Sequence, residues 1–314
     1  MDDRGNPILG LDIGGTKTAV VLGDRAGTIH DRIVFGTRPE RGFEPTFHEL
    51  LASLAEMRGR APRITGRAAG AISVSIGGPL QIEPGIILSP PNLPGWDHIP
   101  LCDRLVEAAG LPTFIEHDGN AGALAEWYFG AGRGRRHLVF LTLGTGLGAG
   151  LILNGDLFRG ASDTAGEIGH IRLADSGPVA YGKAGSWEAL CSGSGIARLA
   201  AHRFPHRWPD GPPDLPKLAD FARAGDPEAT QVFDEAGRWL GRGLALLIDT
   251  LNPELILLGS LAIRLGDLLL SPTRAELARE ALPSALSACE ILPAALGDRH
   301  GDVASLCAAI RALK

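Results

Sequence analysis

The residue types best suited to chemistry lie in one stretch, ILGLDIGGTKTAVVL at residues 8–22. An apolar run leads into a glycine turn, and a second apolar run follows. The turn and its flanks hold Asp12, Gly14, Gly15, Thr16 and Lys17. Glycines let backbone N–H groups converge on an anion, and a carboxylate beside that anion suits a hard metal ion. The stretch indicates an anion site, although an ordinary β-hairpin, whose glycines serve only the turn, fits equally well.

A second stretch repeats this architecture further along the chain. The second stretch is HLVFLTLGTGLGAGLILNGDLF, residues 137–158. It aligns with the first at a constant offset of 130, so that Gly14 falls on Gly144. Its loop presents Thr145 and Gly146. Two copies predict two similar domains whose glycine loops face one cleft, with chance similarity between glycine-rich hairpins as the alternative. Neither loop is a P-loop or a dinucleotide-binding fingerprint.

Carboxylates elsewhere could serve a transfer reaction. Phosphoryl transfer to an alcohol needs a carboxylate near the hydroxyl proton. Asp118, in the segment EHDGN between an apolar strand and a helix, is the candidate, and a helix N-cap is its other possible role. In GEIGH, Glu167 and His170 stand three residues apart. With no cysteine nearby, hydrogen bonding to a polyhydroxy substrate suits these two better than metal binding.

Composition limits the class of protein. The 314 residues are 45% hydrophobic and 21% charged, with a net charge of −6, as in an ordinary soluble protein large enough for two domains. No run of five Lys or Arg occurs, which disfavours nucleic acid as a partner. A polar, acidic N-terminus and apolar runs shorter than ~18 residues disfavour a signal peptide and a membrane span. Four dispersed cysteines predict a reduced, cytoplasmic setting.

The elements that must position these residues alternate between strand and helix. We expect an α/β class, with the strand of residues 68–78, the helix of residues 43–59 and the strand–turn–helix of residues 111–130 in the first half. Residues 226–254 have the apolar spacing of one long helix, followed by a strand at residues 255–262. The helix includes Gly237, Gly241 and Gly243. These glycines predict close packing against another backbone.

Seven motifs, taken in order, resemble those of one family. They are similar to motifs of the ROK family, which includes bacterial repressors and sugar kinases. The seven motifs are DIGGTK, PPNLPGW, EHDGN with AGALAEW, TLGTGLGAGLILNG, GEIGH, GKAGSWEA and LNPELILLG. The resemblance spans residues 8–260. It implies a two-domain actin-like ATPase fold (ribonuclease H-like) with an interdomain cleft, and a homodimer. The small domain would be residues 1–118 and the larger one residues 119–302, with a helix of about residues 303–314 returning to the first.

The resemblance also implies the reaction and the roles of residues. It indicates ATP- and Mg²⁺-dependent phosphorylation of a glucose-like hexose or an N-acetylhexosamine at the 6-hydroxyl, with Asp118 as general base. Asp12 would hold Mg²⁺ through water. The nucleotide would be bound by Asp12, Gly14, Gly15, Thr16, Lys17, Thr145, Gly146 and Gly259. The sugar would be bound by Gly78, Asn92, His117, Asp118, Glu167, His170 and Glu188.

Two departures from the family pattern change what the resemblance implies. The family usually has three cysteines in CxCGxxGCxE, which bind a structural zinc with the GEIGH histidine, whereas residues 179–188 here hold no cysteine. We therefore expect no zinc, and packing of Val179, Tyr181 and Trp187 in its place. His117 stands where the kinases usually have Asn, which leaves the sugar and the pH dependence open.

Two other functions compete with the kinase. A sugar-responsive regulator would carry a helix-turn-helix domain before the first hairpin, and only seven residues precede Ile8. A non-catalytic sugar-binding protein would bind hexose without turnover. Neither the sugar nor the choice between ATP and polyphosphate follows from the sequence.

Overall fold

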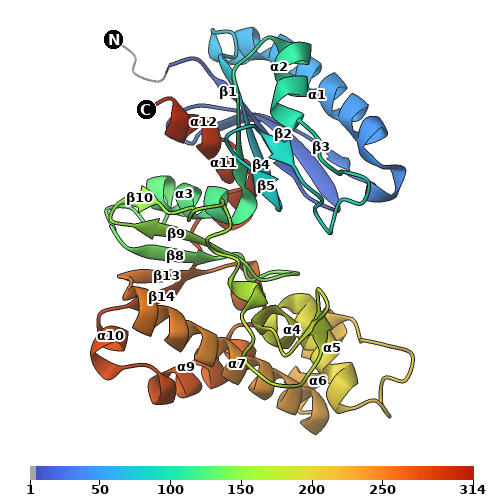
Figure 1. Cartoon of the computed structure of the whole chain (residues 1–314), viewed down its shortest axis with the longest axis vertical. Helices are drawn as coiled ribbons and strands as arrows, with labels where there is room; N and C mark the ends of the chain where they lie inside the picture. Colours follow the sequence, from blue (N-terminus) through green and yellow to red (C-terminus); the bar gives the residue numbers. More distant parts are fainter. Residues whose placement is uncertain (1–4) are drawn as a thin grey trace. The chain divides into compact units, whose positions relative to one another are not determined.

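The chain forms two five-stranded sheets (Figure 1). The computed structural model describes residues 5–314. Unit 1 runs through residue 133 and includes residues 159–165 and 296–314, whereas unit 2 consists of residues 134–158 and 166–295.

The sheet of unit 1 has the order β3-β2-β1-β4-β7. Its strands are β1 (Ile8–Ile13), β2 (Lys17–Gly23), β3 (Ile29–Gly36), β4 (Ala71–Ile76) and β7 (Thr113–His117). β1, β2 and β3 pair antiparallel, and β4 and β7 extend the sheet in parallel with β1. A short hairpin, β5 (Leu80–Gln81) and β6 (Ile86–Ile87), follows β4.

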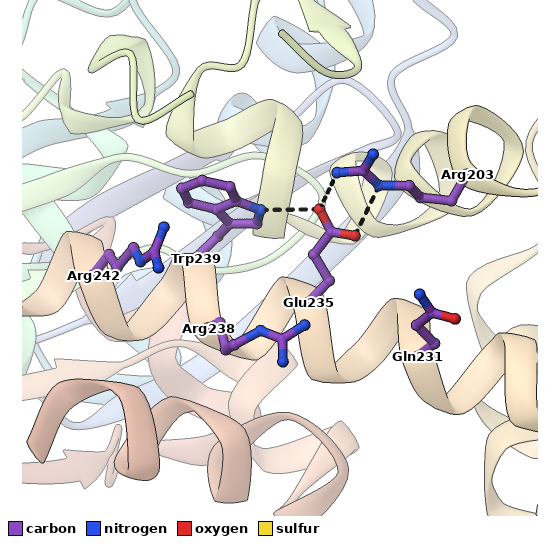
Figure 2. A pocket seen from close by; sticks show the side chains of 6 residues that line it. All are labelled: Arg203, Gln231, Glu235, Arg238, Trp239 and Arg242. Carbon is purple, nitrogen blue, oxygen red and sulfur yellow. Dashed lines mark hydrogen bonds and ion pairs between the residues drawn. The ribbon is translucent and has the colours of Figure 1, made fainter. Parts of the chain in front are cut away.

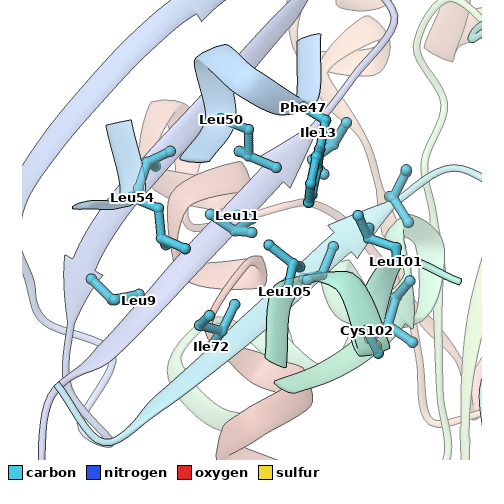
Figure 3. Close-up of a cluster of buried hydrophobic side chains, with 14 of the residues drawn as sticks. Leu9, Leu11, Ile13, Phe47, Leu50, Leu54, Ile72, Leu101, Cys102 and Leu105 are labelled. Atoms are coloured by element: carbon cyan, nitrogen blue, oxygen red, sulfur yellow. The ribbon is translucent and has the colours of Figure 1, made fainter. Parts of the chain in front are cut away.

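Two apolar layers cover this sheet. On one face, α1 (Phe43–Thr65) and α2 (Leu101–Ala109) pack on alternate residues of β1 and β4, including Leu11 and Ile72 (Figure 3). On the other face lie α3 (Asp118–Phe129), α11 (His300–Ala304) and α12 (Cys307–Ala312). Ser73 Oγ of β4 accepts a hydrogen bond from the Ala309 amide, which joins α12 to the sheet. The end of the chain therefore completes the core of unit 1.

The sheet of unit 2 repeats the same strand arrangement, in the order β10-β9-β8-β13-β14. Its strands are β8 (Leu138–Leu141), β9 (Ala149–Leu153), β10 (Asp156–Leu157), β13 (Leu255–Leu258) and β14 (Glu290–Pro293). An antiparallel hairpin again leads into two parallel strands. The repeat predicted from the glycine loops is thus confirmed at the level of sheet topology.

Helices and short segments form the rest of unit 2. The helices are α4 (Trp187–Cys191), α5 (Gly193–Arg203), α6 (Leu215–Arg223), α7 (Pro227–Leu251), α8 (Ser260–Leu265), α9 (Asp267–Glu280) and α10 (Pro283–Ser287). Two short strands, β11 (Val179–Ala180) and β12 (Lys183–Ala184), form a hairpin. The 3₁₀ turns of the chain are η1 (Pro39–Arg41), η2 (Ile168–His170) and η3 (Gly297–Arg299).

The glycines of α7 mark close helix contacts, as the sequence predicts. A Cβ on Gly241 would lie 2.7 Å from the Thr273 carbonyl oxygen of α9, and one on Gly237 would lie 2.4 Å from the Pro272 ring. A Cβ on Gly243 would lie 2.0 Å from the Trp187 indole. A side chain at any of these three positions would force the helices apart.

The structure differs from the sequence expectations in two places. The C-terminal segment forms two short helices, α11 and α12, where one is expected. The predicted domain limit at residue 118 falls before α3, whereas α3 belongs to unit 1 because it packs against α11 and β7. Over residues 5–314, no helix is long and apolar enough to cross a membrane.

Candidate active site

The carboxyl ends of three parallel strands bring together one half of the predicted site. Asp12 of β1 pairs with Ser75 of β4, and Ile76 of β4 pairs with His117 of β7. Asp118 follows β7 directly. Because parallel strands end at the same edge of a sheet, these side chains share one edge of unit 1, where ligands bind in α/β proteins.

Asp12 is partly buried, and Asp118 is the charged neighbour with the largest effect on it. Burial is the main cause that raises the pKa of Asp12 to about 6, and the charge of Asp118 adds to it, while Lys17 lowers it. A Cβ on Gly301 would lie 2.6 Å from Asp12 Oδ2, so α11 leaves no room for a side chain there. A cation would stabilise the ionised carboxylate.

The donor set therefore fits Mg²⁺ held with phosphate and water. No group of three or more His, Cys, Asp or Glu residues suited to a metal occurs among residues 5–314. Mg²⁺ in kinases usually takes only one or two carboxylates, with the remaining ligands from water and phosphate. Asp12, with Asp118 nearby, meets that requirement.

Thr37, a buried residue that belongs to none of the sequence motifs, hydrogen-bonds the backbone of the β1–β2 hairpin tip. The Thr37 hydroxyl donates to the Gly14 carbonyl (2.6 Å), and the Thr37 amide donates to the Thr16 carbonyl (3.1 Å). Because both carbonyls turn toward a buried residue, their oxygens do not oppose an anion at the tip. A Cβ on Gly15 would lie 2.8 Å from the Asn92 carbonyl, which places Asn92 beside this loop.

His117 caps the helix that begins with Asp118. The Gly119 amide donates to His117 Nδ1 (3.2 Å) and to Asp118 Oδ1 (2.7 Å). His117 is therefore the N-cap residue, where the sequence offered Asp118, and the two side chains share the Gly119 amide. The Asp118 side chain is 53% exposed, so a substrate hydroxyl could reach it. A Cβ on Gly78 would lie 2.8 Å from His117 Cδ2, so the imidazole packs against Gly78.

Unit 2 gathers its own set of predicted residues around the second glycine loop. The Leu147 amide donates to Glu188 Oε2 (3.0 Å), and a Cβ on Gly146 would lie 2.9 Å from the same oxygen. Burial raises the pKa of Glu188, with the Leu147 hydrogen bond opposing this effect. Gly259 is also adjacent, since its added Cβ would lie 2.9 Å from the Thr142 carbonyl. Thr145, at the loop tip, is exposed.

The GEIGH motif lies beside Glu188. A Cβ on Gly169 would come within 3.2 Å of Glu188 Cβ. Glu167, which precedes η2, and His170, which ends it, are exposed. The Tyr181 ring stacks on His170 at 5.3 Å between centroids, and Lys183 Nζ donates to the His170 carbonyl (2.7 Å).

The packing predicted for the segment without cysteines is only partly right. Trp187 is fully buried, but Val179 and Tyr181 are each 54% exposed. The reason is that β11 and β12 form an isolated two-stranded hairpin that does not bury these side chains. The Tyr181 ring packs on the His170 ring and not in an apolar core.

Two buried carboxylates that the sequence left without a role flank the site in unit 1. Glu116 forms an ion pair with Arg159. Glu126 accepts hydrogen bonds from the Ala131 amide (3.1 Å) and the Leu296 amide (3.0 Å). Their burial was not visible in the sequence, although Glu116 belongs to EHDGN.

A separate pocket of about 380 Å³ lies between α5 and α7 of unit 2 (Figure 2). It is lined by Arg203, Gln231, Glu235, Arg238, Trp239 and Arg242. Arg203 makes two hydrogen bonds to the Glu235 carboxylate there. The pocket contains none of the predicted site residues.

Comparisons with known proteins agree with the motifs. A model described as the ROK family matches residues 8–310. The glucokinase of Thermotoga maritima is 31% identical over 304 residues, which cover 94% of each chain. A xylose repressor of Bacillus spizizenii is 28% identical over 92% of this chain and 73% of its own.

Two solved structures are similar along nearly the whole chain. The ROK hexokinase of Thermus thermophilus has a TM-score of 0.81 and 32% identity, covering 98% of this chain and 99% of its own. The ROK glucokinase of Streptomyces griseus, in complex with glucose and AMPPNP, has a TM-score of 0.76 and 31% identity, covering 96% and 98%.

Proposed function

The chain belongs to the ROK family and is a sugar kinase with an actin-like ATPase fold, and from this premise we propose that it transfers the γ-phosphoryl group of ATP to the 6-hydroxyl of a glucose-like hexose or an N-acetylhexosamine. The observation that carries the proposal is the shared sheet edge of Asp12, the Gly14–Lys17 tip and Asp118. It supplies an anion site and a carboxylate within one unit.

Asp118 acts as the general base. It accepts the proton of the attacking hydroxyl, which makes the oxygen a better nucleophile as it approaches the phosphorus. The Gly119 amide fixes one carboxylate oxygen at 2.7 Å, and the side chain is otherwise largely open. This arrangement lets Asp118 keep a fixed direction while it meets a substrate.

The two glycine loops bind the phosphates. Thr16 and Lys17 in unit 1 and Thr145 and Gly146 in unit 2 provide hydroxyl, ammonium and amide donors, and Gly259 borders the adenosine. Asp12 would hold Mg²⁺ through water, and the ion would supply positive charge beside the transferred phosphoryl group.

Polar side chains and backbone groups bind the sugar. Gly78, Asn92, His117, Glu167, His170 and Glu188 present the paired donors and acceptors that sugar hydroxyls need. Sugar binding closes the site and excludes water. The protein works as a cytoplasmic homodimer, and its four free thiols accord with a reducing compartment.

A coupled ADP-release assay tests the proposal. The assay offers Mg²⁺ATP, and separately polyphosphate, with glucose, fructose, mannose, N-acetylglucosamine, N-acetylmannosamine, glucosamine and allose. We expect turnover on at least one hexose, and Asp118→Asn should lower kcat by roughly 10²-fold or more. Asp210→Asn, at an exposed aspartate of unit 2, is the control and should retain full turnover.

Three outcomes would contradict the proposal. Wild-type turnover in Asp118→Asn would remove Asp118 from the role of base. Hexose binding without turnover on any sugar would favour a binding protein, and a sugar-dependent shift of upstream DNA in a gel would favour a regulator.

A further inference from the structure

Arg159 forms an ion pair with Glu116, which stands two residues before the proposed base Asp118. We propose that Arg159 is a positioning residue for phosphoryl transfer, which acts through Glu116 on the backbone that carries Asp118. The inference rests on the proposed function, because it assigns Asp118 the role of base. It adds a residue from outside every motif used above.

Glu116 is a fully buried carboxylate whose two oxygens are both in use. Oε2 accepts hydrogen bonds from Arg159 Nε (3.0 Å) and from Arg159 Nη2. Oε1 accepts from the His117 amide (3.1 Å) and from Asn120 Nδ2 (3.0 Å). The carboxylate therefore holds the residue before Asp118 and the residue two positions after it.

The charge of Arg159 is what keeps Glu116 in this place. An ionised carboxylate removed from water needs a counter-charge and hydrogen bonds, and the structure places the guanidinium on it. A guanidinium also binds a carboxylate through more than one N–H, which fixes direction as well as distance. Without Arg159, the Glu116 carboxylate would turn toward water. The His117 amide and the Asn120 side chain would then lose their acceptor, and the junction of β7 and α3 would loosen.

Arg159 reaches Glu116 from a loop that interrupts unit 2. Residues 159–165 belong to unit 1, while the chain on both sides belongs to unit 2. The loop is closed by the Ala165 amide donating to the Arg159 carbonyl (3.0 Å), and Asp163 Oδ2 accepts from the Ile82 amide (3.2 Å). The support of the base thus comes from a segment that neither β7 nor α3 contains. Glu167 follows this loop after one residue, so the same stretch of chain serves the sugar and the base.

Kinetics of Arg159→Ala measure the effect of this support. We expect kcat to fall about 10- to 100-fold, because a small displacement of a reacting group costs that much, while the Kd for Mg²⁺ATP, measured by calorimetry, stays within about threefold. Added guanidinium ion should recover part of kcat, since the truncated side chain leaves room for it beside Glu116. The matched control is Arg203→Ala, which breaks a doubly hydrogen-bonded arginine–glutamate pair outside the site (Figure 2) and should leave kcat unchanged with or without guanidinium.

A double variant shows whether Arg159 acts through Asp118. In the Asp118→Asn background, removing Arg159 should cause little further loss of kcat, because the base is already absent. Wild-type kcat in Arg159→Ala would overturn the inference. The inference would also be overturned if guanidinium did not recover the kcat of Arg159→Ala and the two substitutions lowered kcat independently, so that their fold-losses multiplied in the double variant.

A third variant covers the case in which Arg159→Ala does not fold. Arg159→Lys keeps the positive charge but loses the planar guanidinium group, which donates through two N–H groups. We expect a loss of kcat, with a melting temperature near that of the wild type. Unchanged kcat in this variant would overturn the inference. Failure of the proposed function is seen separately, as full turnover in Asp118→Asn alone.

Discussion

At the scale of single residues, Asp12 shows a conflict between stability and binding. Its pKa is raised to about 6 by burial and by the charge of Asp118, so the folded protein holds the proton more tightly than the unfolded chain does. The ionised carboxylate therefore lowers stability, a cost absent below about pH 4 and complete above about pH 6. A site that binds a cation keeps such a residue because the bound ion offsets the cost.

We expect Asp12→Asn to stabilise the nucleotide-free protein at pH 8, by roughly 1 to 3 kcal/mol, because two pKa units correspond to that range at most. The difference from the wild type should vanish near pH 4. Urea unfolding at both pH values, without Mg²⁺, measures it. The same variant should lose at least about 10²-fold in kcat, and Mg²⁺ATP should raise its melting temperature less than that of the wild type. A variant less stable than the wild type at pH 8 would show that the buried charge carries no penalty.

At the scale of elements, the conformation of the β1–β2 hairpin tip, which we propose binds phosphate, depends on the residue that follows β3. Thr37, directly after β3, holds the Gly14 carbonyl and also hydrogen-bonds the Thr18 hydroxyl of β2 (2.9 Å). Its own carbonyl accepts from the Thr46 hydroxyl of α1 (3.0 Å). The loop conformation is therefore fixed by β2, β3 and α1 together, and not by its glycines alone.

Thr37→Val removes the hydroxyl but keeps nearly the same side-chain shape and volume. It should therefore loosen the hairpin tip without disturbing the packing around residue 37. The loss leaves a buried carbonyl and a buried hydroxyl without their partner, which costs about 1 to 3 kcal/mol. We expect KM for ATP to rise about tenfold, while the Kd for hexose is unchanged. Thr37→Ser keeps the hydroxyl and is the control, with KM for ATP near that of the wild type. If Thr37→Val matched Thr37→Ser in both KM and stability, the hydrogen bond to Gly14 would have no role.

The contrast between these elements shows what a sequence can predict. The glycine hairpins, their repeat and the tight α7 glycines follow from local residue types, and the structure has them all. Thr37 and Arg159 were not predictable, because Thr37 meets Gly14 across 23 positions and Arg159 meets Glu116 across 43. Such contacts depend on strand pairing and loop docking, which no spacing rule encodes. His117 was recognised as unusual, but its capping role needed the geometry of α3.

At the scale of the whole chain, Glu126 joins two of the places where the backbone crosses between unit 1 and unit 2. The chain passes to unit 2 after residue 133 and returns at residue 296. The carboxylate of Glu126, on α3, accepts from the amides of Ala131 and Leu296, one beside each crossing. Burial alone would raise its pKa, but the interaction with His300 (Nδ1 to Oε1, 3.5 Å) and the hydrogen bonds from these two amides lower it on balance. The ionised form is thus favoured by the fold.

Glu126→Gln tests how much of unit 1 this carboxylate stabilises. An amide of the same shape must turn an NH₂ group toward one of the two backbone donors, so one buried N–H loses its acceptor, at about 1 to 3 kcal/mol. Because the pKa of Glu126 is lowered in the folded protein, its contribution is complete above the ordinary glutamate pKa and is lost as pH falls below it. The difference in unfolding free energy between the variant and the wild type should therefore be largest near pH 7 and shrink below about pH 4.5. Glu107→Gln, on the exposed face of α2, is the control. A difference that stays constant with pH would mean that the shape of the side chain, and not its charge, joins the two crossings.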